Sequence, residues 1–256
     1  MLNHERKSYL LSILQKTGRI VAKETSRELQ LSEDTIRRDL RELAKEGRLK
    51  RVHGGAVPVA PANAPFPART TIANPEKSAI GKRAAQMVQT GNVVFVDGGT
   101  TALQLVRHLP RNLKATIITH SPNVAMELLG HERLEIEIVG GRLFRHSIVT
   151  CGAATISWLD RYRPDICFIG ATGIHPTQGI TTGDSEEAEV KRTIIARSGA
   201  AVILASSEKL GAVSSFEIAP WSDIDSIIVS ADAHMRAMEL FAHLDCEILS
   251  SSKEQA

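Results

Sequence analysis

The sequence predicts an α/β protein in which a small helical domain precedes a larger domain with a mostly parallel sheet. Short apolar runs alternate with helical patterns in the second part, and a proline- and alanine-rich segment follows residue 58. Residues 1–58 hold 13 Lys and Arg against 8 Asp and Glu, a net charge of +5, whereas the remainder carries −3. We therefore expect domains at 1–58 and 75–250, joined by a linker over 59–74.

The larger domain is predicted from seven apolar runs separated by helical patterns. Strands are expected at 93–96, 116–119, 135–139, 166–169, 202–205, 226–229 and 247–249. Helices are expected at 75–89, 101–109, 122–129, 153–159, 185–197 and 233–242. This repeated strand–helix–strand order is typical of a parallel sheet, which binds ligands beyond the carboxyl ends of its strands.

In the smaller domain, the most informative segment is a helix expected at 33–46. Ser32 is a good N-cap for it. With about 3.6 residues per turn, apolar side chains share one face. Three arginines lie on the opposite face: Arg37, Arg38 and Arg41. Guanidinium groups bind phosphate oxygens or guanine edges, and a helix fits the major groove, so this face favours DNA binding. A solvated amphipathic helix shows the same charge pattern.

A helix-turn-helix is expected over about residues 20–39, because a short helix at 22–29 and a three-residue link precede the arginine helix. Residues 48–57 then alternate and are interrupted by two glycines, Gly54 and Gly55, which is typical of a β-hairpin. Such a hairpin would form the wing of a winged helix-turn-helix. It would carry three polar side chains toward DNA: Lys50, Arg51 and His53. An ordinary turn also explains the two glycines.

The strand expected at 93–96 runs into a loop that suits a phosphate group. The loop consists of Asp97, Gly98, Gly99, Thr100 and Thr101. Glycines let backbone N–H groups approach an anion, threonines add hydroxyl donors, and the following helix N-terminus favours negative charge. The same residues also make a good strand-to-helix turn without any ligand. From the residues alone, both interpretations stay open.

Two motifs at their separation resemble the DeoR family of bacterial transcription regulators. They are Thr35-Ile36-Arg37-Arg38-Asp39-Leu40 and Arg51-Val52-His53-Gly54-Gly55-Ala56. The resemblance implies a winged DNA-binding domain over about 3–58 and a double-stranded operator as partner. The family's DNA-facing positions are matched by Ser32, Thr35, Arg37 and Arg38. A repressor of a sugar or polyol catabolic operon is the function that the resemblance implies.

Residues 75–230 resemble the sensor domain of the same family. Matches occur at the 97–101 loop, at Thr119-His120-Ser121 and at Glu187-Ala188-Glu189-Val190-Lys191-Arg192. That domain is similar in fold to ribose-5-phosphate isomerase, which implies a phosphorylated sugar or polyol as effector. The resemblance places Ser121, Glu187 and Lys209 near the effector, beside the loop. The family usually has Asn where His120 stands, and Asp-Ser-Ser-Lys where this chain reads Ser206-Ser207-Glu208-Lys209.

Two of these residues also have structural explanations. Asp184 or Ser185 can cap the helix expected at 185–197, with Glu187 reaching back to the cap. Glu208 and Lys209 can form a surface ion pair. Neither alternative needs a ligand.

Two classes of function remain: a DNA-binding repressor, or a sugar-phosphate isomerase-like enzyme with an accessory DNA-binding domain. An isomerase needs a carboxylate base and an electrophile beside the phosphate loop. The sequence shows no such set, so we expect a regulator without catalytic residues. Three widely spaced cysteines, Cys151, Cys167 and Cys246, predict neither disulfides, metal nor another cofactor. These cysteines indicate free thiols in the reducing cytoplasm. No apolar run approaches the roughly 18 residues of a membrane span. We further expect a homo-oligomer, a dimer or tetramer, because paired recognition helices read symmetric half-sites.

Overall fold

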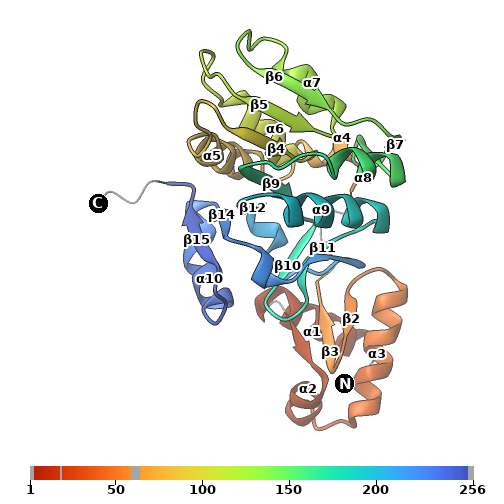
Figure 1. Ribbon diagram of the computed structural model, residues 1–256. Coiled ribbons are helices and arrows are strands. Elements are labelled where there is room, and N and C mark those ends of the chain that lie inside the picture. Colours follow the sequence, from red (N-terminus) through yellow and green to blue (C-terminus); the bar gives the residue numbers. More distant parts are fainter. Residues whose placement is uncertain (1–2, 18, 59–63, 253–256) are drawn as a thin grey trace.

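The computed structural model describes residues 3–17, 19–58 and 64–252, and it folds into two lobes (Figure 1). The helices of the smaller lobe are α1 (Asn3–Thr17), α2 (Ala22–Glu28) and α3 (Glu33–Lys45). Its strands are β1 (Ile20–Val21), β2 (Lys50–Val52) and β3 (Gly55–Val57), in the order β1-β3-β2. The predicted helix-turn-helix and its wing are confirmed.

The wing is fixed by its two glycines. Strand β1, which the sequence does not predict because two residues show no periodicity, pairs antiparallel with β3. A Cβ at Gly55 would lie 1.7 Å from the carbonyl oxygen of Ile20, so this pairing requires glycine. Gly54 has a φ of 77°, a left-handed conformation that glycine adopts without strain. The hairpin turn therefore depends on Gly54, and the close approach of β1 depends on Gly55.

The larger lobe is built on a seven-stranded parallel sheet in the order β15-β14-β12-β9-β4-β5-β6. These are the seven predicted strands: β4 (Val93–Val96), β5 (Thr116–Thr119), β6 (Glu135–Ile138), β9 (Ile166–Gly170), β12 (Ala201–Ala205), β14 (Ser226–Val229) and β15 (Glu247–Ser250). The six predicted helices are α5 (Asn74–Ala85), α6 (Thr100–Arg107), α7 (Pro122–Leu128), α8 (Ala153–Leu159), α9 (Ser185–Arg197) and α10 (Ala231–Phe241).

Helices cover both faces of this sheet. Val94 and Val96 of β4 pack in one hydrophobic cluster with residues of α5, α6 and α7. Phe95, between them, points to the opposite face and packs in a second cluster with residues of α8, α9 and α10. The central strands are therefore buried on both faces, which explains why they form continuous apolar runs in the sequence.

Two smaller sheets lie outside the predicted pattern. Strands β10 (Gly173–His175), β11 (Gly179–Thr182) and β13 (Phe216–Ala219) form one, and β7 (Arg142–Phe144) with β8 (Val149–Cys151) forms the other. Both sheets are antiparallel. Figure 1 shows β10 and β11 at the end of the larger lobe that faces the smaller lobe.

The expected linker contains a short helix, contrary to its proline- and alanine-rich composition. Helix α4 (Phe66–Arg69) begins after Pro65, and the Phe66 side chain is buried. The backbone N–H of Phe66 donates to the carbonyl oxygen of His146 at 2.8 Å. Contact with the larger lobe thus stabilises a short helix that the composition of this segment does not predict. The rest of the expected linker includes residues 59–63, which lie outside the described ranges.

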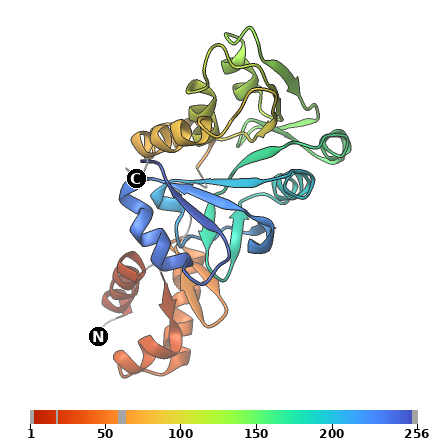
Figure 2. The same ribbon diagram turned by 60° about the vertical axis from the view of Figure 1, so that its left-hand side comes forward.

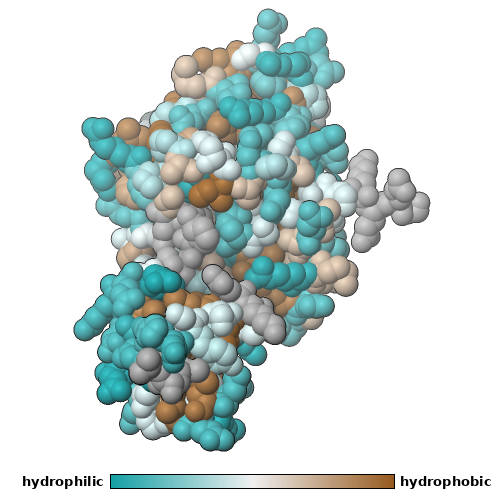
Figure 3. All heavy atoms as spheres, turned by 180° about the vertical axis from the view of Figure 1, so that it is seen from behind, coloured by the Kyte–Doolittle hydropathy of each residue, from teal (hydrophilic) through white to brown (hydrophobic). Residues whose placement is uncertain are grey.

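The smaller lobe lies at one end of the larger lobe (Figure 2). Seen from behind, much of the smaller lobe is covered by hydrophilic residues, with hydrophobic residues between them (Figure 3). Within the described ranges, no helix combines the length and apolar character needed to cross a membrane.

Candidate functional site

Helix α3 starts at a hydroxyl cap. The Oγ atom of Ser32 accepts a hydrogen bond from the backbone N–H of Thr35 at 3.2 Å, and the two side-chain hydroxyls lie 2.8 Å apart. The cap satisfies an amide that the first helical turn leaves without a partner. Ser32 is exposed and Thr35 is half-buried, so both lie at the accessible start of the helix.

The three predicted arginines of α3 project into solvent. The guanidinium of Arg37 donates to Glu33 at 2.6 and 3.0 Å, and Nε of Arg41 donates to the carbonyl oxygen of Arg37 at 3.3 Å. Arg38 has no ion-pair partner among the described residues. The Arg37 side chain is therefore held in position in the absence of a ligand, whereas no ion pair with another described residue fixes the Arg38 side chain.

Helix α3 and the wing form one continuous cationic surface. Arg37, Arg51 and His53 line a hollow of about 140 Å³ between the helix and the hairpin. Arg51 and His53 are exposed. Lys50 is half-buried, and burial lowers the pKa of its ammonium group. The structure thus brings helix and hairpin residues together as predicted, with Lys50 the least accessible.

A buried ion pair, which the sequence analysis did not identify, fixes α3 to α1. Asp39 is fully buried, and its carboxylate accepts hydrogen bonds from Nε and Nη2 of Arg6. The apolar neighbours of Asp39 on its helix face, Ile36 and Leu40, are the signal that could have indicated a buried partner. The pair sets the angle at which the arginine face is presented.

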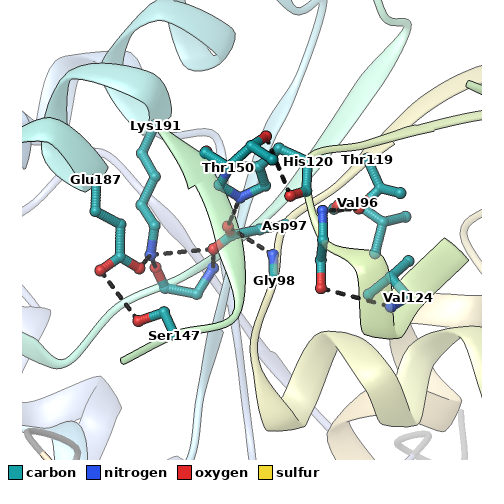
Figure 4. Close-up of polar contacts among 12 residues, drawn as sticks. Val96, Asp97, Gly98, Thr119, His120, Val124, Ser147, Thr150, Glu187 and Lys191 are labelled. Carbon is teal, nitrogen blue, oxygen red and sulfur yellow. Dashed lines mark hydrogen bonds and ion pairs between the residues drawn. The ribbon is translucent and has the colours of Figure 1, made fainter. Parts of the chain in front are cut away.

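In the larger lobe, Asp97 joins the ends of three strands. Its carboxylate accepts from Gly98 N, His120 Nε2, Gly170 N and Lys191 Nζ at 2.7–3.1 Å (Figure 4). Burial by itself would raise the pKa of Asp97, but the charge of Lys191 and the hydrogen bond and charge of His120 hold it well below its usual value. Asp97 is fully buried and does not line the pocket described next. Its role is to hold the loop at Gly98 in place through the hydrogen bonds just described.

The loop after Asp97 opens onto a small pocket at the N-terminus of α6. Gly98, Gly99, Thr100 and Thr101 line this cavity of about 20 Å³. A Cβ at Gly98 would lie 2.1 Å from Cγ1 of Val149, so only glycine fits there. The Oγ1 atom of Thr101 is buried without a hydrogen-bond partner. An unsatisfied buried hydroxyl is unfavourable, which indicates a polar ligand at this place.

Three cations converge on the same pocket without carboxylate partners. Nζ of Lys77 donates to the carbonyl oxygen of Arg69 at 2.9 Å, and Nζ of Lys209 donates to that of Leu204 at 3.3 Å. The guanidinium of Arg69 donates a hydrogen bond from Nη2 to Ser147 Oγ at 3.4 Å. Burial lowers the pKa of all three groups, that of Lys209 to about 8. Within the described ranges none forms an ion pair, so Lys209 is not part of the surface ion pair considered above.

In a capping box, the Glu187 side chain would bond the backbone N–H of the N-cap residue, but it pairs with another residue here. Asp184 caps α9 by accepting from the backbone N–H of Glu187 at 3.0 Å. The Glu187 carboxylate instead pairs with Lys191 at 3.0 Å and accepts hydrogen bonds from Ser147 and Thr182. It therefore lines the pocket wall rather than reaching back to the cap.

The structure gathers six of the eight predicted effector residues around one pocket: Gly98, Gly99, Thr100, Thr101, Glu187 and Lys209. Asp97 and Ser121 do not line it. Ser121 is fully buried and caps α7 by accepting from the backbone N–H of Val124 at 3.4 Å. The sequence analysis missed the contributions of Arg69, Lys77 and Lys191. Among the described residues, no group of His, Cys, Asp or Glu is arranged to hold a metal ion.

Comparison with known proteins identifies both lobes. Residues 6–61 match the DeoR-like helix-turn-helix domain, and residues 73–231 match the DeoR C-terminal sensor domain. The HTH-type transcriptional regulator GlpR of Haloferax volcanii is 34% identical over 230 residues, which are 89% of this chain and 90% of that protein. The HTH-type transcriptional repressor GlcR of Bacillus subtilis is 31% identical, over 100% of this chain and 99% of its own. The glycerol-3-phosphate regulon repressor of Escherichia coli is 27% identical, over 97% of this chain and 100% of that protein.

Among solved structures, ribose 5-phosphate isomerase A from Methanocaldococcus jannaschii covers 52% of this chain and 53% of its own length, with 23% identity and a TM-score of 0.39. A likeness at that level carries no information about activity. The relatives that match nearly the whole chain are transcription regulators, not enzymes. The chain therefore belongs to the DeoR family of DNA-binding transcription regulators.

Proposed function

We propose that this protein is a repressor whose affinity for its operator is controlled by a phosphorylated sugar or polyol. The observation that carries the proposal is the set of unpaired cations, Arg69, Lys77 and Lys209, around the Gly98–Thr101 loop. The pocket lining holds four cations, Arg69, Lys77, Lys191 and Lys209, against two carboxylates, Glu187 and Glu208. An excess of buried positive charge is costly, and a phosphate group would supply the missing negative charge. The backbone N–H groups at the start of α6 add donors of the kind that bind phosphate oxygens.

The names of two relatives agree with this effector class and direction. One is a glycerol-3-phosphate regulon repressor, and another is a transcriptional repressor. We infer that the protein acts as a homo-oligomer, because paired recognition helices read symmetric half-sites. The operator contacts are assigned to Ser32, Thr35, Arg37, Arg38, Arg41, Lys50, Arg51 and His53.

Within the effector site, the residues divide into two roles. Gly98, Gly99, Thr100, Thr101 and Lys209 would bind the phosphate group. The other predicted residues, Asp97, Ser121 and Glu187, would hold the loop, helix α7 and Lys191 in place through the hydrogen bonds already described.

A thermal-shift screen of the purified protein tests the proposal. The panel contains phosphorylated three- to six-carbon sugars and polyols, each beside its unphosphorylated counterpart. A ligand at about 100 times its dissociation constant stabilises the folded state by about 2.7 kcal/mol. Phosphorylated compounds alone should raise the melting temperature, and Lys209→Met should weaken that response. If no phosphorylated compound stabilises the protein, or if the neutral counterparts act equally, the proposed effector class is wrong.

A further inference from the structure

We propose that Arg69 binds the effector, and that the linker helix α4, which carries Arg69, is thereby the element that transmits effector binding to the DNA-binding lobe. This inference rests on the proposed function, because it names a further residue and the mode of regulation of the same pocket. The predicted linker over 59–74 is then part of the sensor and not a passive connection.

The first observation is the position of the Arg69 guanidinium. It lines the pocket beside Thr100 and Thr101, and its Nε atom is buried without a hydrogen-bond partner. The same group lies 5.8 Å from the ring centre of Phe66, in the same short helix. Among the described residues, no carboxylate lies within ion-pair distance of it. The Arg69 side chain therefore lines the cavity with a buried donor that has no partner among the described residues, although Glu187 lies on the same pocket wall. Its guanidinium group has the fork geometry that suits phosphate oxygens.

The second observation is the size of the cavity. A volume of about 20 Å³ holds one water-sized group, since a water needs roughly 10–15 Å³ by this measure. A phosphoryl group needs more room than this. Most of the wall comes from elements attached to the parallel sheet, whereas Arg69 and Ile72 come from the linker segment. We infer that the linker is the part of the wall that moves when an anion enters, and that Arg69 then holds it to that anion.

The third observation is how α4 is attached. Its contacts with the larger lobe include the Phe66 N–H to His146 bond and the Lys77 ammonium to the carbonyl oxygen of Arg69. Between α4 and α5 lies Ala73, a non-glycine residue with a left-handed φ of 49°. Such a conformation costs of order 1 kcal/mol and persists only where its surroundings hold it. We infer that this four-residue helix, which lies next to a strained junction, is an element that a ligand contact shifts between two positions.

Helix α4 follows the wing closely in the sequence. Strand β3 of the wing ends at Val57 and α4 begins at Phe66, so only positions 58–65 separate them. Strand β3 is buried and pairs with both β1 and β2. Helix α4 is therefore the first described helix after the central strand of the wing sheet, and we infer that its position is coupled to the wing.

Hydrogen exchange of the full chain tests the inference, with inorganic phosphate and glycerol 3-phosphate as probes and glycerol as the neutral control. In the wild type, either anion should slow amide exchange in residues 66–72. Arg69→Met should weaken anion binding roughly ten- to hundredfold, the range for a charge-assisted hydrogen bond. At saturating anion it should also abolish the protection of 66–72. Lys82→Met, which removes an exposed charge from α5 outside the pocket, is the matched control and should behave as the wild type.

The outcomes separate this inference from the proposed function. If the wild type binds the anions and Lys209→Met weakens binding, but Arg69→Met binds as tightly as the wild type, Arg69 is no ligand and the proposed function survives. If exchange in 66–72 is unchanged by a bound anion in the wild type, the role of the linker is refuted without any variant. If the wild type binds neither these anions nor any phosphorylated compound in the screen, both proposals fail. Arg69→Lys, which keeps the charge and loses the fork, shows whether a weakened Arg69→Met has merely unfolded locally, because it should recover part of the affinity.

Discussion

The arginines of α3 are alike in the sequence but differ in their surroundings. Arg37 is tied to Glu33 one turn earlier, and Arg41 to the backbone of Arg37. Arg38 is exposed without such a tie. An exposed ion pair is worth little in stability, so its contribution is to hold the Arg37 side chain in one rotamer. We infer that Arg37 is preorganised for its contact and that Arg38 becomes ordered only on DNA.

Replacing either arginine should weaken operator binding without loosening the fold. Arg37→Ala and Arg38→Ala should each cost about 1–3 kcal/mol of operator affinity if the side chain reads a base. Because both side chains are exposed, the melting temperature should not change. Fluorescence anisotropy on operator and scrambled duplex measures the loss, and Lys114→Ala in the sensor lobe is the control. Unaltered operator affinity in both variants would refute the assignment.

Lys209 gives effector binding a pH dependence. Its pKa of about 8 means that the ammonium of the effector-free protein loses its proton as the pH rises through 8, mainly because the group is buried. An anion is attracted by the ammonium and not by the neutral amine, so affinity should fall by up to about tenfold per pH unit above 8. Below about pH 6 the phosphate monoester gains a proton, and affinity should fall again. Calorimetric titration from about pH 5 to about pH 9.5 measures both limits.

The variant Lys209→Met separates this cause from others. Its affinity should be lower at neutral pH and nearly flat between pH 7 and 9.5. A decline above pH 8 that persists in Lys209→Met would assign the titration to another group.

At the scale of elements, the sequence predicts the helices and strands that a local pattern of residues determines. The five inner strands of the sheet are largely buried and form apolar runs, so their positions follow from the sequence. The two edge strands, β6 and β15, are more exposed. The position of helix α4 does not follow from the sequence, because it depends on Phe66 finding a site in the other lobe. Strands β10, β11 and β13 are not predicted either, because they are short and because β11 pairs with β13 from a distant segment of the chain.

The effector pocket divides in the same way. The Gly98–Thr101 loop and Lys209 are recognisable from their motifs, whereas Lys77 and Arg69 carry no local signal. Lys77 enters the pocket because α5 packs against α6, and Arg69 enters through the linker helix. Their convergence is a property of the tertiary structure, which a pattern along the chain does not contain.

The wing offers a test of element packing through two glycines. Gly55→Ala places a Cβ against the carbonyl of Ile20 and must separate β1 from β3, so we expect a loss of about 1–3 kcal/mol of stability and weak operator binding. Gly140→Ala meets no atom within 4 Å and should be nearly neutral. Differential scanning calorimetry compares the two. Equal melting temperatures for Gly55→Ala and wild type would show that the wing sheet is looser than the structure indicates.

At the scale of the whole molecule, charge is divided between two tasks. Residues 1–58 carry +5 and the remainder −3, so attraction to a polyanion comes from the smaller lobe. In the larger lobe, Arg69, Lys77 and Lys209 instead line one buried pocket. This division lets one chain bind two kinds of phosphate, in the operator and in the proposed effector, without competition between them.

Because of this division, salt dependence should distinguish the wing from the recognition helix. Arg51 is exposed on the hairpin, where a phosphate contact is the expected role. Arg51→Ala should weaken binding to operator and scrambled DNA alike, and it should reduce the slope of log affinity against log salt by about 1 per wing. Arg38→Ala should instead lower the preference for operator over scrambled DNA. Titrations between 50 and 200 mM salt on both duplexes measure the two effects. If Arg51→Ala leaves the slope unchanged while Arg38→Ala reduces it, the helix contacts the backbone, the wing reads the bases, and the proposed orientation on DNA is reversed.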